Sequence, residues 1–157
     1  MSPAAILGCL VLVAMPVIAC ASPASPTADS ISEIKQERDC SGCDSGTVVT
    51  LRRDGTATLL RTGKARHGTT DRTSTGTVPA AEFQRLAALI VSKGFYQLQD
   101  EYRDPTLADG SWVTTTASGE QAKTVVDSNA AGPANLREIE DAIEAVRTSI
   151  TWSPPDR

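Results

Sequence analysis

Aromatic residues are scarce in this sequence, which has two each of Trp, Tyr and Phe and an aromatic content of only 4%. The core must therefore be built mostly from aliphatic side chains, and we expect no aromatic platform for sugars or single-stranded bases. The formal net charge is -4 and the isoelectric point about 5.0, which argues against nucleic acid as a partner. The composition therefore argues against ligands that stack on several aromatic side chains and against nucleic acid.

The common motifs of catalysis and cofactor binding are also absent. The chain contains no P-loop, no dinucleotide-binding glycine fingerprint and no G-x-S-x-G nucleophile elbow. It offers no convincing carboxylate pair, and we expect the single histidine, His67, to lie in an exposed loop. The acidic residues between positions 100 and 109 lack EF-hand spacing and are interrupted by Pro105, so they predict a solvated loop. We expect neither a metal nor a cofactor.

The N-terminal segment is apolar at almost every position from Ala4 to Ile18. It is shorter than the ~20 residues that a transmembrane helix needs, and it has the length of a signal-peptide hydrophobic region. Residues 17–20, Val-Ile-Ala-Cys, resemble the lipobox of bacterial lipoproteins, with an aliphatic residue at -3 and a small residue before the cysteine. The resemblance implies that residues 1–19 are a signal peptide and that the Cys20 thiol becomes lipidated.

A lipid on Cys20 would anchor the protein to a membrane of the bacterial cell envelope. Ala21, rather than Asp, at the second mature position resembles the signal for sorting to the outer membrane, on its periplasmic side, in a cell that has one. The run Ala19-Cys20-Ala21 also fits an A-x-A cleavage site, which would release a soluble secreted protein instead. Both localisations remain open at this point.

Length and composition indicate one domain behind this leader. Residues 20–30 are mostly small and include two prolines, so we expect a flexible tether that begins with the lipidated cysteine. Residues 31–152 form the expected single domain, and residues 153–157 form a C-terminal tail.

Two cysteines, Cys40 and Cys43, form a C-x-x-C pair. Because an exported protein meets an oxidising compartment, we expect a disulfide that clamps the chain just ahead of a β-hairpin. Closing so short a loop stabilises a fold by roughly 2 kcal/mol in the chain-entropy model. The same spacing occurs in thiol-disulfide redox proteins, which place the first cysteine at a helix N-terminus. Asp39 and Asp44 flank the pair and disfavour a thiolate, so redox activity and metal ligation are the weaker alternatives.

Two alternating runs, Thr47–Arg53 and Thr56–Arg61, flank Asp54-Gly55. The pattern predicts a β-hairpin with a type I′ turn, which needs a positive φ at both central residues. Because a two-residue turn fixes the register, it also predicts which apolar side chains share the face toward the core. They are Val49, Leu51 and Leu60.

Two amphipathic helices are predicted over Pro79–Lys93 and Pro133–Ile150, and Gly94 suits the position just past the first. Their apolar stripes are Phe83, Leu86, Ala87 and Ile90 in the first, and Leu136, Ile139, Ile143, Val146 and Ile150 in the second. Further strands are predicted at Thr69–Thr77, near an edge, and in a hairpin of Trp112–Ala117 and Gln121–Val126. Ile31–Arg38 is a weaker strand candidate, because Ile31 and Ile34 also fit helical spacing.

The order β-β-β-α-β-β-α favours an α+β fold in which two helices cover one face of an antiparallel sheet of about five strands. Between Arg52 and Arg72 the chain carries six Lys or Arg residues against two acids. Such an excess is typical of a solvated sheet face and loop, and it also suggests a surface that contacts an anionic partner. The residues of that surface are Arg52, Arg53, Arg61, Lys64 and Arg66.

From Ile31 to about Trp152 the chain resembles an uncharacterised bacterial family, domain of unknown function 6438. The resemblance rests on the cysteine pair around Gly42, Asp54-Gly55, and a set of positions along the first helix and beyond it. These are Gly76, Pro79, Phe83, Gly94-Phe95-Tyr96, Leu98, Tyr102 and Asp109. The cysteine spacing is one residue shorter than in the family, and Asp44 replaces a proline. The resemblance implies export and an α+β fold, and it carries no known activity.

Together these features predict a membrane-anchored envelope lipoprotein that acts as a non-enzymatic binding or assembly module. Its expected partners are the membrane, through the lipid on Cys20, and another envelope protein or an anionic envelope polymer. The alternative function is a thiol-disulfide redox protein that uses Cys40 and Cys43.

Overall fold

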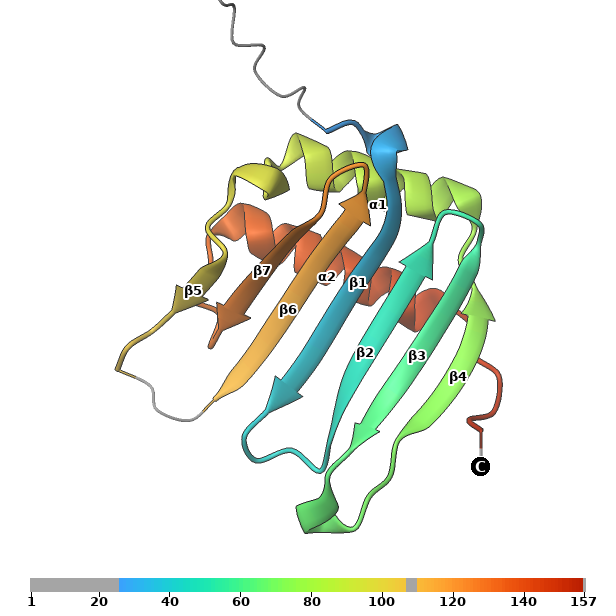
Figure 1. The fold of residues 1–157 in the computed structure, drawn as a ribbon, viewed down its shortest axis with the longest axis vertical. Helices are drawn as coiled ribbons and strands as arrows, with labels where there is room; N and C mark the ends of the chain where they lie inside the picture. The colour runs from blue at the N-terminus through green and yellow to red at the C-terminus, as the bar shows by residue number, and fades with distance from the viewer. Residues whose placement is uncertain (1–25, 107–109, 157) are drawn as a thin grey trace, which may run out of the picture.

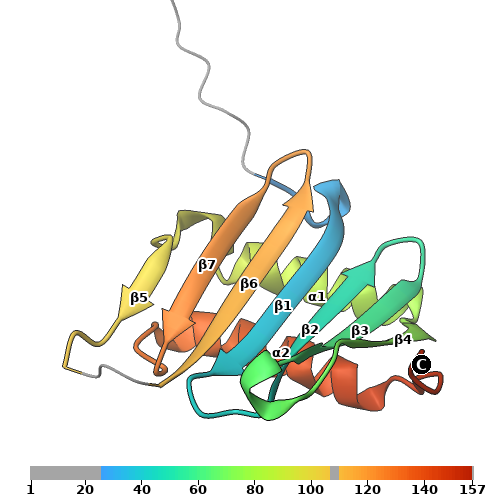
Figure 2. The same ribbon diagram turned by 60° about the horizontal axis from the view of Figure 1, so that its bottom comes forward.

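The computed structural model describes residues 26–106 and 110–156. Residues 1–19, Cys20 and the first part of the expected tether lie outside the described residues, so the predictions made for them stay predictions. Figure 1 shows one broad sheet with two long helices packed against the same face, and Figure 2 shows both helices again on that side. Within the described ranges, no helix is long and apolar enough to cross a membrane.

In chain order the elements are η1 (Ala28–Ser30), β1 (Ile31–Cys40), β2 (Ser45–Arg52), β3 (Thr56–Gly63), η2 (Ala65–His67), β4 (Arg72–Thr77), α1 (Ala80–Ser92), η3 (Phe95–Gln97), β5 (Glu101–Arg103), β6 (Ser111–Gly119), β7 (Lys123–Ser128) and α2 (Ala134–Ser149). The sheet has seven strands in the order β4-β3-β2-β1-β6-β7-β5. All neighbours are antiparallel except β5 and β7.

The α+β class is therefore confirmed, and the number of strands is seven rather than about five. One additional strand is β5, which lies in the acidic segment that the sequence analysis interpreted as a loop. It is only three residues long and pairs along the outer edge of β7. A strand this short carries too little alternation to be recognised from sequence.

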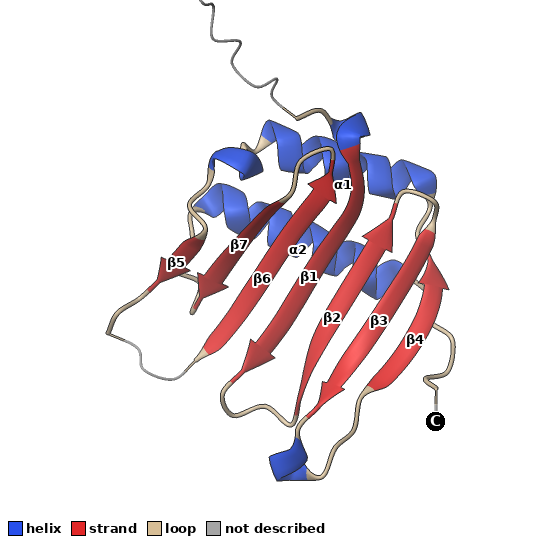
Figure 3. Ribbon diagram, viewed as in Figure 1, coloured by secondary structure: helices blue, strands red, loops and turns tan. Residues whose placement is uncertain are grey.

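Strand β1 lies at the centre of the sheet, where its edges pair with β2 and β6 (Figure 3). Ile31 and Ile34 are both fully buried although they are three residues apart. The register against β6 shifts between Ile31 and Glu33, as it does at a β-bulge, and the additional residue turns both isoleucines to the core face. The bulge explains why this strand has the spacing of a helix.

The hairpin of β2 and β3 is present, but its predicted turn and register are wrong. Its loop contains Arg53, Asp54 and Gly55, and of these only Gly55 has a positive φ, +91°. The Gly55 N–H donates to the carbonyl of Arg52 over 3.0 Å. One more residue in the turn shifts every cross-strand pair by one position, so the opposite set of β3 side chains reaches the core.

Leu59 now lies opposite Val49, and Ala57 lies opposite Leu51. Val49, Leu51 and Ala57 are buried, and Leu59 packs against the core from a partly buried position. Leu60, which the sequence analysis placed in the core, pairs with Val48 on the face that no helix covers.

The predicted stripes of both helices are confirmed. Every predicted stripe residue of α1 is at most 1% exposed, and those of α2 are at most 7% exposed, including Ile150 just beyond the helix. Gly94 has a φ of +68°, as expected for the residue that ends the α1 segment.

Both ends of the domain extend further than predicted. Residues 28–30 of the expected tether form η1, which packs against α1, and Asp29 accepts a hydrogen bond from Gln84 over 3.1 Å. The C-terminal tail runs along the edge strand β4. Ser153 N–H donates to the carbonyl of Thr75 over 2.8 Å, and Asp156 N–H donates to that of Thr73 over 2.9 Å.

Replacing Gly55 by alanine is expected to lower the free energy of unfolding by about 1–2 kcal/mol, because a side chain disfavours its positive φ. Urea unfolding monitored by circular dichroism measures the change. The matched control is Gly42→Ala, since a Cβ at Gly42 meets nothing within 4 Å. An equal loss in both variants would contradict this account of the turn.

Candidate functional site

The cysteine pair lies where β1 ends and turns into β2. Cys40 and Cys43 form a disulfide with a Cα–Cα distance of 5.3 Å, and the turn between them is closed by a hydrogen bond from Cys43 N–H to the Cys40 carbonyl over 3.4 Å. Cys40 is the last residue of a strand and β2 follows the turn, so no helix N-terminus points at either sulfur. The geometry is that of a clamp at a strand end, and the redox hypothesis stays a prediction.

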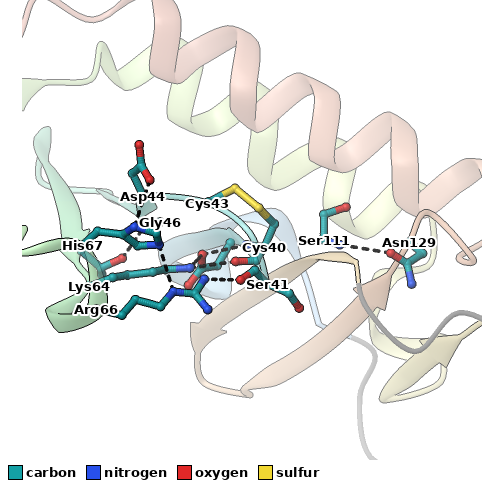
Figure 4. Close-up of a disulfide and its surroundings, with 12 residues drawn as sticks. Cys40, Ser41, Cys43, Asp44, Gly46, Lys64, Arg66, His67, Ser111 and Asn129 are labelled. Carbon is teal, nitrogen blue, oxygen red and sulfur yellow. Dashed lines mark hydrogen bonds and ion pairs between the residues drawn. A yellow bond between two sulfur atoms is a disulfide. The ribbon is translucent and has the colours of Figure 1, made fainter.

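The loop that contains Lys64, Arg66 and His67 lies against the disulfide turn (Figure 4). Lys64 Nζ lies 2.6 Å from Asp39 Oδ1 and 2.7 Å from the Cys40 carbonyl oxygen, and the Lys64 and Asp39 side chains are each only 17% exposed. Burial raises the pKa of Asp39, but hydrogen bonds from Lys64 and from Cys40 N–H, with the charges of Lys64 and Arg66, outweigh it and hold that pKa below its ordinary value. The pair ties the loop to the end of β1.

His67 and Arg66 complete the loop. Arg66 donates to the Ser41 carbonyl and, from Nε, to His67 Nε2 over 3.0 Å. His67 Nδ1 lies 3.4 Å from Asp44 Oδ1, and His67 is exposed as predicted. Each of these side chains is used to fix one loop on another, so this end of the sheet is a structural junction.

The structure does not bring the five predicted basic residues onto one surface. Arg52 pairs with Glu33 at 3.0 Å on the uncovered face of the sheet. Arg53 donates to the carbonyls of Ile31 and Ala28 and lies over the ring of Phe83 at 5.3 Å. Lys64 and Arg66 hold the disulfide turn, as described above. Of the five, only Arg61 has a side chain that makes no hydrogen bond or ion pair with any residue in the described part of the chain.

Arg61 lines a groove that the sequence analysis missed, here called the arginine groove. It lies between the helix-covered face of β3 and β4 and the C-terminal end of α2, and its volume is about 410 Å³. Its lining residues are Leu59, Arg61, Arg72, Ser74, Arg147, Trp152 and Pro155. Arginines from β3, β4 and α2 thus meet beside the indole of Trp152.

Two contacts fix the α2 wall of the arginine groove. Arg147 makes a bidentate ion pair with Glu144, with N–O distances of 2.7 and 2.5 Å. Trp152 Nε1 donates to the Arg147 carbonyl over 3.1 Å, which holds the indole against the end of the helix. A Cβ on Gly76 would lie 3.2 Å from Trp152 Cε3, so glycine lets the C-terminal segment lie close to β4.

A second polar cluster is buried where α2 crosses β1, β6 and β7. Glu140 and Asp127 are 5% and 2% exposed, and Gln36 and Thr115 lie beside each other on the sheet below α2. Gln36 Nε2 donates to the Glu140 carbonyl over 3.2 Å, and Asp127 accepts the Gly132 N–H over 2.9 Å. Glu140 Oε1 and Thr115 Oγ1 have no hydrogen-bond partner among the described residues.

Burial, and then the negative charge of Asp127, raise the pKa of Glu140 from 4.5 to about 7; Asp141 adds to this rise, while Arg38 and Arg137 oppose it. The predicted buried stripe of the second helix did not include Glu140. Its distance of four residues from Leu136 and three from Ile143 was the signal that it faces the core. The residues that line the main pockets of the described chain do not include Glu140, Asp127 or Thr115.

The described residues include no group of three or more His, Cys, Asp or Glu side chains placed to hold a metal ion. Asp109, one of the acids in the predicted solvated loop, lies outside the described residues.

The chain folds into a small α+β domain with a disulfide at the end of its central strand, and one known family of such domains matches its sequence. The profile of the family described as "Domain of unknown function (DUF6438)" matches residues 36–147, from within β1 to near the end of α2. The chain therefore belongs to this family, as its sequence indicated. No curated protein matches the chain.

Because the pKa of Glu140 is about 7 in the folded state and 4.5 in the unfolded chain, this group favours folding most at low pH. Above the unfolded value of 4.5 the unfolded chain releases this proton, so the free energy of unfolding should fall by about 2–3 kcal/mol between pH 4.5 and 7. Glu140→Gln should remove that decrease and be the more stable protein at pH 8.

Urea unfolding at a series of pH values measures this dependence. Glu138→Gln is the control, because Glu138 is an exposed glutamate on the same helix. It should keep the pH dependence of the unsubstituted protein. Identical pH profiles for Glu140→Gln and the unsubstituted protein would refute the assignment.

Proposed function

We propose that this protein is a lipid-anchored lipoprotein of the bacterial cell envelope whose domain is a non-enzymatic binding module. The lipid on Cys20 holds the chain at the membrane, after removal of residues 1–19 as a signal peptide. The arginine groove then binds a negatively charged component of the envelope.

The observation that carries this proposal is the pairing of Arg61 with Arg72. They lie directly opposite each other on β3 and β4, and both are exposed. Like charges at directly opposed positions destabilise a sheet. Neither arginine side chain makes a hydrogen bond or ion pair with any other described residue, so the fold gains no polar contact from these side chains. An anionic ligand supplies the counter-charge that the domain itself does not.

No acidic residue of the described chain is among those that line the arginine groove. Glu144 is held by Arg147, and Asp71 accepts the Gly63 N–H over 2.8 Å. Asp156 lies with Arg72 at an adjacent pocket but makes no ion pair with it. The lining thus carries two arginines, Arg61 and Arg72, without an ion-pair partner among the described residues, in a protein whose net charge is -4.

Export also agrees with the Cys40–Cys43 disulfide, because disulfides persist in oxidising compartments and are rare in the cytosol. The sorting to the outer membrane inferred from Ala21 belongs to the same proposal.

Replacing Cys20 by serine should move the protein from the membrane fraction to the soluble fraction, because the thioether-linked lipid can no longer form. Detergent phase separation of cells that express each form measures the partition. Cys9→Ser is the control and should leave the protein in the detergent phase. Unchanged partition of Cys20→Ser would rule out the anchor.

Binding through the arginine groove is tested by a photoreactive p-benzoylphenylalanine residue incorporated at Ser74, which lines the groove. Irradiation of intact cells should link the protein to an acidic envelope component that mass spectrometry identifies. The same residue placed at Thr124, on the uncovered face, is the control. Recovery of no adduct above background from Ser74, or of the same adducts from both positions, would count against the proposal.

A further inference from the structure

The lining of the arginine groove restricts the chemistry of what it binds. A guanidinium group presents N–H donors in a planar fork that matches the two oxygens of a carboxylate or a phosphate. Arg61 and Arg72 come from neighbouring strands at one level of the sheet, so they can engage two acid groups of one ligand or both oxygens of a single one. The ligand of the arginine groove must therefore carry an oxyanion, such as a carboxylate or a phosphate.

The remaining lining is apolar or carries a hydroxyl group. Leu59 and Pro155 line the same groove as the half-buried indole of Trp152, and Ser74 adds a hydroxyl without a partner among the described residues. A flat indole packs well against a rigid ring with an apolar face, while its own N–H is already bonded to Arg147. The ligand therefore combines acid groups with rings, as an acidic sugar does. The low aromatic content led us to expect no aromatic platform for sugars, and this inference revises that expectation, because the single Trp152 is enough for one sugar ring.

Two other sources of oxyanions fit the position of the groove less well. An extended acidic peptide would bind by adding to the free edge of β4, but Ser153 and Asp156 already hydrogen-bond to that edge. A lipid head group would have to meet the side that faces the membrane. The C-terminal segment, which supplies Trp152 and Pro155 to the groove, runs beside β4 away from η1, the first described element of the chain (Figure 1).

We propose that the arginine groove binds an acidic polysaccharide of the envelope, with Arg61 and Arg72 on its oxyanions and Trp152 on a sugar ring. This inference names the ligand class of the proposed binding function and rests on it.

The test is binding of the purified lipid-free domain, residues 21–157, to polygalacturonate, with dextran as the neutral polysaccharide. Binding should be confined to polygalacturonate and weaken as salt rises. Arg72→Gln should weaken it about tenfold or more, the effect of one lost charge-assisted contact, without lowering stability. Lys35→Gln removes the same charge from the uncovered face and should change the affinity less than about twofold.

The contribution of the ring is tested at Trp152. Trp152→Ala should weaken binding several-fold, and Trp152→Phe, which keeps an aromatic face, should restore most of it. Urea unfolding of each variant separates a loss of binding from a loss of folding. Equal weakening by Phe and Ala in folded proteins would overturn the role of the ring.

Further experiments distinguish a failure of the polysaccharide assignment from a failure of the proposed binding function. Binding to phosphatidylglycerol vesicles or to polyphosphate with higher affinity than to polygalacturonate overturns the polysaccharide assignment. If no polysaccharide binds while the residue at Ser74 captures an acidic protein in cells, the inference fails and the binding function stands. If neither experiment detects a ligand, both fail.

Discussion

Strand β1 makes hydrogen bonds to a neighbour on both of its edges, and the arrangement of the domain depends on this double pairing. The strands β4, β3 and β2 lie on one side of it, and β6, β7 and β5 lie on the other. β2 follows directly through the disulfide-clamped turn, whereas β6 reaches β1 only after α1 has crossed the helix-covered face. Because the two halves of the sheet meet only at β1, the buried Ile31 and Ile34 join both halves to the helices.

On the helix-covered face of the sheet, the position of α2 determines which charged groups are buried and which are exposed. The register places Arg72, Arg61, Thr47, Arg38, Val113 and Asp127 side by side across the sheet. Asp127 is buried near the start of α2, and burial raises the pKa of Glu140 to about 7, because the loss of water disfavours the charged carboxylate. An arginine cannot become neutral, since its guanidinium stays charged. Arg38, in the middle of the row, donates to the Glu140 carbonyl and lies 3.8 Å from Glu144, whereas Arg61 and Arg72 are exposed and have no acidic partner among the described residues. The row thus runs from the exposed Arg61 and Arg72 at the arginine groove to the buried Asp127 near the start of α2.

The predicted basic surface shows why proximity in sequence did not identify a site. Side chains alternate between the two faces along a strand. Arg61 pairs with Thr47 of β2, and Arg52 is an odd number of residues further along β2, so Arg52 lies on the uncovered face and Arg61 on the other. Arg53 belongs to the turn and is bound to η1, and Lys64 and Arg66 are used to hold the disulfide turn. The third arginine of the groove, Arg147, comes from α2 and has no relation to the others along the chain. Cross-strand pairing and helix packing assembled this site, and neither leaves a local motif.

The sequence by itself determined the α+β class, the positions of both helices, their buried stripes and the disulfide pair. These features depend on contacts or periodicities within a few residues, where the side-chain pattern and the backbone geometry determine each other. Only the tertiary structure decided the register of the β2–β3 hairpin, the bulge in β1, the pairing of β5, and the neighbours of Arg61 and Glu140. A single additional residue in a turn reverses which side chains reach the core, and the burial of Glu140 depends on packing against strands far away in the chain. Such outcomes follow from long-range contacts that no local pattern specifies.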